Sequence, residues 1–250
     1  MAEPHTTTHF GFKEIPIGEK VRQVGRIFDS VAENYDLMND LMSLGIHRLW
    51  KRHAIGRLRV RPGSHTLDVA GGTGDLARLT LERMGGRGRV TLCDINAAML
   101  EAGRVKLADQ GLVAGIDWVQ GNAEHLPFPD NTFHAATIGF GIRNVTRIET
   151  AFREMVRVLR PGGQLLCLEF SHLSLTALQP LYDTYSFKVL PELGHWVAKD
   201  RDAYQYLAES IRRFPDQKTL CALLDGLGLH RVGYHNLSAG IAAVHTGFKV

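Results

Sequence analysis

Acidic residues and glycines gather around one short segment of the chain in a pattern suited to binding a small ligand. Asp68 comes just before the glycine-rich run AGGTG (residues 70–74), and Asp94 follows that run by about 20 residues. Gly121-Asn122-Ala123 forms a further polar turn. Glycines let the backbone approach a ligand without interference from Cβ atoms, and carboxylates accept hydrogen bonds from hydroxyl and ammonium groups. The candidate ligand contacts are therefore Asp68, Gly71, Gly72, Thr73, Gly74, Asp94, Asn122 and Ala123.

Two classes of cofactor fit this pattern, and Asp68 distinguishes them. Residues 72–77 satisfy the dinucleotide pattern G-x-G-x-x-A, and an acid in the place of Asp94 takes ribose hydroxyls in both classes. The negative charge of Asp68 would oppose a pyrophosphate, whereas it suits the cationic ammonium group of S-adenosylmethionine. Asn122 and Ala123 can then face the adenine. The pattern favours S-adenosylmethionine, with a dinucleotide or a purely structural glycine turn as alternatives.

Strand and helix patterns alternate around these residues. We expect strands over 65–69, 89–93, 116–120, 135–140 and 164–170, separated by helices over 75–83, 97–109 and 148–159. A final helix over 217–227 and two strands over 229–236 and 241–248 close the chain. Such alternation predicts a mainly parallel sheet with helices on both faces. The fold class is therefore α/β and Rossmann-like, and its ligand lies beyond the carboxyl ends of the strands.

The remaining segments predict helical cover over the binding edge of that sheet. Residues 1–18 are expected to form a flexible tail, and two or three helices over 19–60 an N-terminal cap. Residues 171–215 hold 7 of the 20 aromatic residues and are too long for a simple connection, so they predict substrate cover or a second small core. We expect one domain over 19–250, with the cofactor core at 61–170 and a helix and strand pair at 216–250.

Composition excludes several classes of protein. The 250 residues are 44% hydrophobic and 22% charged, which is ordinary for a globular protein and argues against disorder. Lysine and arginine outnumber aspartate and glutamate by only 29 to 26, too small an excess to indicate a nucleic-acid partner. Three separated cysteines and the histidine spacing predict neither disulfides nor a metal site. Without a signal peptide or an apolar run of about 20 residues, we expect a soluble cytoplasmic protein.

Several segments resemble a known family of methyltransferases. The string YDLMN (35–39) with SLG (43–45), His47 and Trp50 is similar to the N-terminal signature of the ubiquinone/menaquinone biosynthesis C-methyltransferases. RVLRPGG (157–163) with LEFS (168–171) is similar to their second signature, and residues 139–145 and 204–211 resemble two further family segments. The first string is the most specific of these, and the resemblance covers nearly the whole chain from about residue 25 onward.

This resemblance implies a class I fold and methyl transfer from S-adenosylmethionine to a ring carbon of a polyprenyl benzoquinol or demethylmenaquinol. Such a carbon is a poor nucleophile until a neighbouring phenol loses its proton, so the site needs a proton acceptor or water relay and a cation. We expect Arg143 to hold the phenolate or orient a water and Asn144 to position the ring oxygen. Tyr35 is expected to close over the sulfonium or to donate a hydrogen bond to the quinol. An arginine paired with a surface acid and a packing tyrosine are the alternatives. Other candidate proton carriers are His125, His172 and His195.

One residue departs from the family pattern. The family has serine before Phe-Gly at the end of the fourth strand, where this chain has Gly139. The resemblance assigns the serine hydroxyl a contact with the cofactor. At Gly139 we therefore expect this contact to be lost or replaced by backbone or water.

An enzyme without a membrane span would have to reach a substrate that lives in a bilayer. A basic run without acids offers contact with the inner membrane, at about 1 kcal/mol per charge near anionic lipid; it comprises Arg48, Lys51, Arg52, Arg57, Arg59 and Arg61. A solvated helix face is the alternative, and partner proteins of quinone biosynthesis or a homo-oligomer also stay open. So do other functions: methylation of another lipid or phenol, an NAD-dependent oxidoreductase, or a non-catalytic cofactor-binding module.

Overall fold

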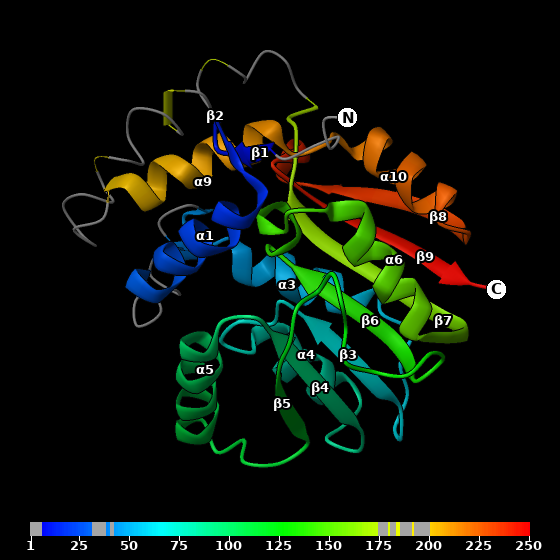
Figure 1. Ribbon diagram of the computed structural model, residues 1–250. Helices are drawn as coiled ribbons and strands as arrows, with labels where there is room; N and C mark the ends of the chain where they lie inside the picture. Colours follow the sequence, from blue (N-terminus) through cyan, green and yellow to red (C-terminus); the bar gives the residue numbers. More distant parts are fainter. Residues whose placement is uncertain are drawn as a thin grey trace.

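A seven-stranded sheet forms the centre of the molecule in a computed structural model of the chain (Figure 1). The structure describes residues 7–31, 39–40, 43–174, 180, 184–185, 192 and 201–250. In spatial order the strands are β5 (Ile116–Gln120), β4 (Arg89–Asp94), β3 (His65–Val69), β6 (Phe133–Gly139), β7 (Leu159–Phe170), β9 (Ala242–Lys249) and β8 (Leu229–Leu237). Strands β5 to β7 run parallel, and β9 is antiparallel to both neighbours. The predicted α/β class with a mainly parallel sheet is confirmed.

Helices cover both faces of the sheet because its strands are apolar on both sides. Along β7, Leu166 and Leu168 face a core shared with α3 (His47–Gly56), α4 (Asp75–Arg83) and α9 (Arg201–Arg213). Leu165 and Cys167 face the opposite side, where α6 (Ile148–Val158) and α10 (Gln217–Gly226) pack. A third cluster joins α4 and α5 (Ala97–Asp109) to β4. The alternation follows from the two-residue period of a strand.

The connections of the chain reverse direction between β3 and β6. From β3 the chain moves outward through α4 to β4 and through α5 to β5, and then returns to the other side of β3 to form β6 and β7. The carboxyl ends of β3 and β6 therefore lie at the topological switch point, where open α/β sheets bind their ligands.

The N-terminal segment differs from the flexible tail that its sequence indicates. Thr7–Phe10 (β1) and Lys13–Pro16 (β2) pair as an antiparallel hairpin, and α1 (Ile17–Val31) follows directly. Phe10 stacks on Tyr206 of α9 with ring centroids 4.2 Å apart, and the Phe12 amide donates to Glu209 Oε2 at 2.9 Å. Figure 1 shows the hairpin beside α9. These contacts join residues nearly 200 positions apart, so local sequence could not reveal the hairpin.

Parts of the expected helical cover are present in the described residues. Helices α1 and α3 come from the N-terminal cap, while residues 32–38 and 41–42 lie outside the described residues. About half of 171–215 also lies outside them. Its described helix, α9, buries Tyr204 and Leu207 in the main core. At Tyr204 the aromatic segment thus extends the main core instead of forming a separate one.

Candidate active site

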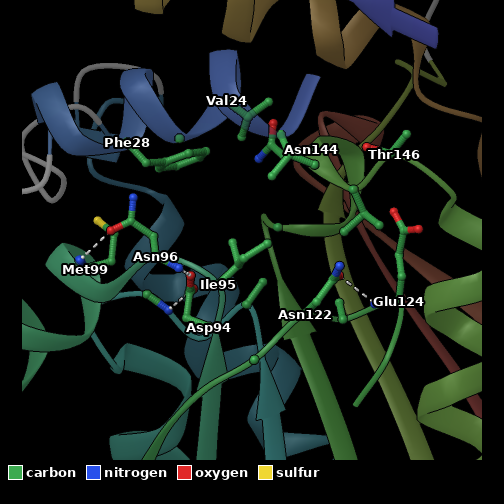
Figure 2. A pocket seen from close by; sticks show the side chains of 18 of the residues that line it. Val24, Phe28, Asp94, Ile95, Asn96, Met99, Asn122, Glu124, Asn144 and Thr146 are labelled. Carbon is green, nitrogen blue, oxygen red and sulfur yellow. Dashed lines mark hydrogen bonds between the residues drawn. The ribbon is translucent and has the colours of Figure 1, made fainter. Parts of the chain in front are cut away.

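Loops from the carboxyl ends of four parallel strands surround one cavity, which is shown in Figure 2. Ala70 and Gly72 follow β3, and the other loops contribute residues 94–96, 121–124, 140–141 and 144–146. Helix α1 lies across the cavity and contributes Val24 and Phe28. The apolar side of an amphipathic helix therefore faces these loops at the switch point.

Asp94 is held firmly at this cavity. Its Oδ2 accepts a hydrogen bond from the Gly72 amide and its Oδ1 one from the Asn96 amide, each 2.9 Å long. Burial raises the pKa of the Asp94 carboxyl, although both amides favour its charged form. Each carboxylate oxygen keeps a second lone pair, so Asp94 can still accept hydrogen bonds from the hydroxyls of a ligand.

The neighbouring turns complete this part of the site. Gly72 and Gly74 have φ of +53° and +85°, values that glycine adopts without strain, and Gly74 is the N-cap of α4. Asn122 and Ala123 line the cavity, and Asn122 Oδ1 accepts from the Glu124 amide at 2.9 Å (Figure 2). Asn122 is thus both a turn residue and a lining residue.

A second cavity adjoins the first at Ala70, which lines both. The predicted contacts Asp68, Gly71, Thr73 and Gly139 lie here and not in the first cavity. Asp68 is 1% exposed, and its Oδ1 accepts from the Thr137 hydroxyl at 2.8 Å. Among the described residues its Oδ2 has no hydrogen bond of normal geometry, although the Ala77 amide favours its charged form. Burial raises the pKa of Asp68 to about 7, so a cation at this oxygen would be strongly favoured.

Gly139 has a packing reason for lacking a side chain. A Cβ atom on Gly139 would lie 2.3 Å from Leu76 Cδ1, and Leu76 is itself 4% exposed. Leu76 therefore fills the space that a serine would need in this conformation.

Arg143 does not line the first cavity but a neighbouring one, which shares Val145 and Thr146 with it, and its guanidinium is held in a buried ion pair. Its Nη1 donates to Glu169 Oε1 and to the Phe140 carbonyl, both at 2.6 Å, and its guanidinium lies 5.3 Å from the centroid of the Phe170 ring. The Arg143 and Glu169 side chains are 3% and 1% exposed. The alternative of a partner acid at the surface is therefore wrong. Within the described residues Arg143 Nε has no hydrogen-bond partner.

Asn144, in contrast, lines the first cavity directly. Its Oδ1 accepts from the Tyr206 hydroxyl at 3.0 Å, which fixes the orientation of the amide. Its Nδ2 has no hydrogen-bond partner in the described part of the chain. Figure 2 shows Asn144 on the side of the cavity that faces Val24. Tyr35, the third predicted catalytic residue, lies outside the described residues.

The chain is similar to known proteins over nearly its whole length. A model of the ubiE/COQ5 methyltransferase family matches residues 17–249. The chain belongs to that family. It is 55% identical over 249 residues to the ubiquinone/menaquinone biosynthesis C-methyltransferase UbiE of Legionella pneumophila strain Philadelphia 1, covering 100% of both chains. It is also 55% identical to the protein of that name from Xanthomonas campestris pv. campestris, covering 99% of this chain and 98% of the relative.

Solved structures share the fold of this ubiE/COQ5 family member. A SAM-dependent methyltransferase from Aquifex aeolicus superposes with a TM-score of 0.60 at 16% identity, over 85% of this chain and 97% of its own. The [4+2]-cyclase SpnF superposes with a TM-score of 0.66 at 17% identity, over 91% and 95%. Since a cyclase shares the fold, the fold alone does not determine the reaction. Family membership decides against the oxidoreductase alternative.

The structure of this methyltransferase adds site residues that its sequence did not reveal. Glu169 and Tyr206 fix Arg143 and Asn144, and Lys51 of the basic run is 6% exposed and bonded to Asp75 at 2.6 Å. The basic run is therefore not one continuous surface. The sequence could have indicated Glu169, because an acid within the apolar strand LLCLEF must find a buried partner.

The other predicted proton carriers lie away from the first cavity or outside the described residues. His125 is exposed, His172 Nε2 contacts the Phe214 carbonyl at 2.8 Å, and His195 is not described. The described residues contain no group of three or more His, Cys, Asp or Glu side chains that could hold a metal ion. None of the described helices has the length and apolar character to cross a membrane.

Proposed function

We propose that this methyltransferase moves a methyl group from S-adenosylmethionine to a ring carbon of a polyprenyl quinol, a benzoquinol or a demethylmenaquinol. The names of its relatives, at 55% identity over essentially the whole chain, support this reaction. In the chain itself, the main support is that Asp94 and the Asn144 amide line one cavity, with Nδ2 of Asn144 lacking a partner among the described residues.

The residues around the two cavities fit S-adenosylmethionine. Asp94 would take the ribose hydroxyls, Asn122 and Ala123 would lie against the adenine, and Asp68 would take the ammonium group of the methionine end. Asp68 is the strongest support for this fit, because a buried carboxylate oxygen without a partner is costly unless a cation meets it. Gly71, Gly72 and the Thr73 hydroxyl would line the path between the two ends, whereas Gly74, the N-cap of α4, lines neither cavity. When bound, the cofactor supplies an electrophilic methyl group.

Asn144 and Arg143 would act on the quinol in different ways. Asn144 donates Nδ2–H to the ring oxygen beside the reacting carbon, while Tyr206 prevents the amide from rotating. Arg143 stays in its ion pair, because moving it away would leave the buried carboxylate of Glu169 without a positive partner. Its positive charge favours the phenolate, and its Nε–H holds a water that takes the phenol proton and passes it on to solvent. Tyr35 would close the site from the N-terminal signature.

The reaction is tested by incubating the protein with methyl-labelled S-adenosylmethionine and each demethylated quinol. We expect label on a ring carbon of at least one quinol, with the ratio of the two rates giving the preference. In parallel, calorimetric titration measures the affinity of the protein for S-adenosylhomocysteine and for NAD. Tight cofactor binding without label in either quinol would contradict the proposed substrate, and binding of NAD alone would contradict the cofactor.

The proposed substrate also requires contact with a membrane, which we place at the cytoplasmic surface of the inner membrane. Leu44 and Leu49 are 74% and 62% exposed close to the exposed Arg48 and Arg52, an arrangement suited to an anionic bilayer surface. Sedimentation with anionic vesicles should show binding that salt weakens and that Leu49→Ser with Arg52→Ser abolishes. Absence of vesicle binding would favour partner proteins or a second copy of the chain on this surface, which light scattering can detect.

A further inference from the structure

The second cavity is lined both by a carboxylate without a full set of partners and by a buried cation. Asp68 Oδ2 has no hydrogen bond of normal geometry among the described residues, and Lys51 of α3 is 6% exposed. We infer that Lys51 binds the α-carboxylate of the methionine end of S-adenosylmethionine, next to the ammonium group at Asp68. This inference rests on the proposed cofactor and adds a binding residue to it.

The lining presents both signs of charge: Lys51 is the cation, and Asp68 and Asp75 are the carboxylates. An α-amino acid end carries opposite charges on neighbouring groups, so a protein that buries it must meet both charges within a small space. Lys51 is the one cation among the described residues that line this cavity. Burial raises the pKa of Asp68, and the charge of Lys51 is among the effects that oppose the rise. Lys51 and Asp68 therefore interact electrostatically already.

The ammonium group of Lys51 can still donate hydrogen bonds, and its charge is only partly balanced by Asp75. Its Nζ donates to Asp75 Oδ2 at 2.6 Å, which is its one hydrogen bond within the described residues, although an ammonium group has three N–H bonds. Lys106 Nζ lies 2.8 Å from Asp75 Oδ1, so two ammonium groups share one carboxylate. The cavity also lies at the N-terminus of α4, which begins at Asp75 and favours a negative charge.

The competing explanation is that Lys51 only ties α3 to α4 through Asp75. Lys106 provides a matched control, because it pairs with the same carboxylate but does not line the second cavity. Lys51→Met and Lys106→Met each remove one cation from Asp75. Only Lys51→Met removes a cation from the cavity that contains Asp68.

Calorimetric titration with S-adenosylmethionine and with decarboxylated S-adenosylmethionine separates the two explanations without turnover. The two ligands differ only in the carboxylate. Wild-type protein should bind the first about 10- to 100-fold more tightly, as expected for a charged hydrogen bond in a buried site. Lys51→Met should reduce this preference to within about threefold, while affinity for the cationic decarboxylated ligand should not fall. Lys106→Met should keep the preference, and Lys51→Arg should keep part of it.

Equal losses for both ligands in Lys51→Met would overturn the inference and assign Lys51 a structural role. A wild-type protein without a preference between the ligands would overturn it too. If the wild-type protein binds neither ligand, the proposed cofactor itself is contradicted, and the inference about Lys51 falls with it. Thermal unfolding checks each ligand-free variant, and Lys51→Gln replaces Lys51→Met in the same comparison if the latter does not fold.

Discussion

Replacing Arg143 tests the stability and the chemistry of the site together. Arg143 Nη1 lies 2.6 Å from Glu169 Oε1, and both side chains are almost completely buried. Arg143→Met keeps an unbranched apolar stem but removes the guanidinium group, which leaves the Glu169 carboxylate buried without its cation. A second variant, Arg143→Met with Glu169→Gln, removes both charges, and its glutamine can still accept the hydrogen bond that the Phe170 amide now donates to Glu169 at 2.9 Å.

The expected loss of stability in the single variant is large. Breaking a buried ion pair by removing one partner costs about 3–5 kcal/mol. In a protein of this size each kcal/mol lowers Tm by about 2–4 °C, so Tm should fall by about 6–20 °C. Burial raises the pKa of Glu169 and Arg143 opposes that rise, so the pKa rises further in the variant. A protein that contains a carboxyl with a raised folded-state pKa becomes less stable as that carboxyl ionises with increasing pH. The loss of stability relative to wild type should therefore be larger at about pH 8 than at about pH 5.

Urea and thermal unfolding of the ligand-free proteins at several pH values measure these effects. We expect the double variant to recover at least half of the lost stability and to lose the added pH dependence. It should nevertheless turn over the quinol slowly while binding S-adenosylhomocysteine normally, because the cation near the phenolate is gone.

Two stability results would refute this reasoning. One is a single variant as stable as the wild type at about pH 8. The other is a double variant no more stable than the single one. If a stable double variant turns over the quinol as fast as the wild type, the ion pair still explains stability. Arg143 then has no role in the chemistry.

Three further predictions concern the cavity linings. Asp68→Asn should stabilise the ligand-free protein by up to about 4 kcal/mol at about pH 8 and by almost nothing near pH 4, because burial raises the pKa of Asp68 to about 7 and its ionisation costs stability between these pH values. Tyr206→Phe should lower kcat/KM for the quinol about tenfold with little change in S-adenosylhomocysteine affinity, since it removes the hydrogen bond that orients Asn144. Gly139→Ser should cost about 1–3 kcal/mol through overlap with Leu76, and this cost should be smaller in a Leu76→Ala background. Urea titrations check the first and third predictions, and steady-state kinetics with calorimetry check the second.

Each of these predictions has an outcome that contradicts it. For Asp68→Asn this is a stability difference from wild type that does not change with pH. For Tyr206→Phe it is an unchanged kcat/KM, which would mean that Asn144 needs no orientation. For Gly139→Ser it is additivity with Leu76→Ala, which would mean that the two positions do not compete for space.

Local patterns were sufficient to predict most of the central sheet. The strand at His65–Val69 and the helices at Asp75–Arg83 and Ala97–Asp109 have the bounds that periodicity and glycine turns indicate. Such patterns depend on residues a few positions apart, so a single sequence contains them. The hairpin at 7–16 shows the limit, because its strands are polar and contact α9 from the far end of the chain.

The candidate site divides in the same way. Parallel strands bring their carboxyl ends to one edge, so the residues that follow each strand, such as Asp94 and Asn144, could be assigned to a common site in advance. The sequence could not predict that these residues line two adjoining cavities. Asp68 and Gly72 are close neighbours in sequence, yet they line different cavities.

The sequence by itself therefore determined the order of the elements in the central sheet, the binding edge of that sheet and the family, because these follow from local patterns and from motifs. Only the tertiary structure decided which charges meet. Arg143 is paired with Glu169, 26 positions away, and Lys51 reaches Asp75 from another helix. The physical reason is that a buried charge is stabilised by whatever lies within a few ångströms of it in space, and folding alone determines that neighbour.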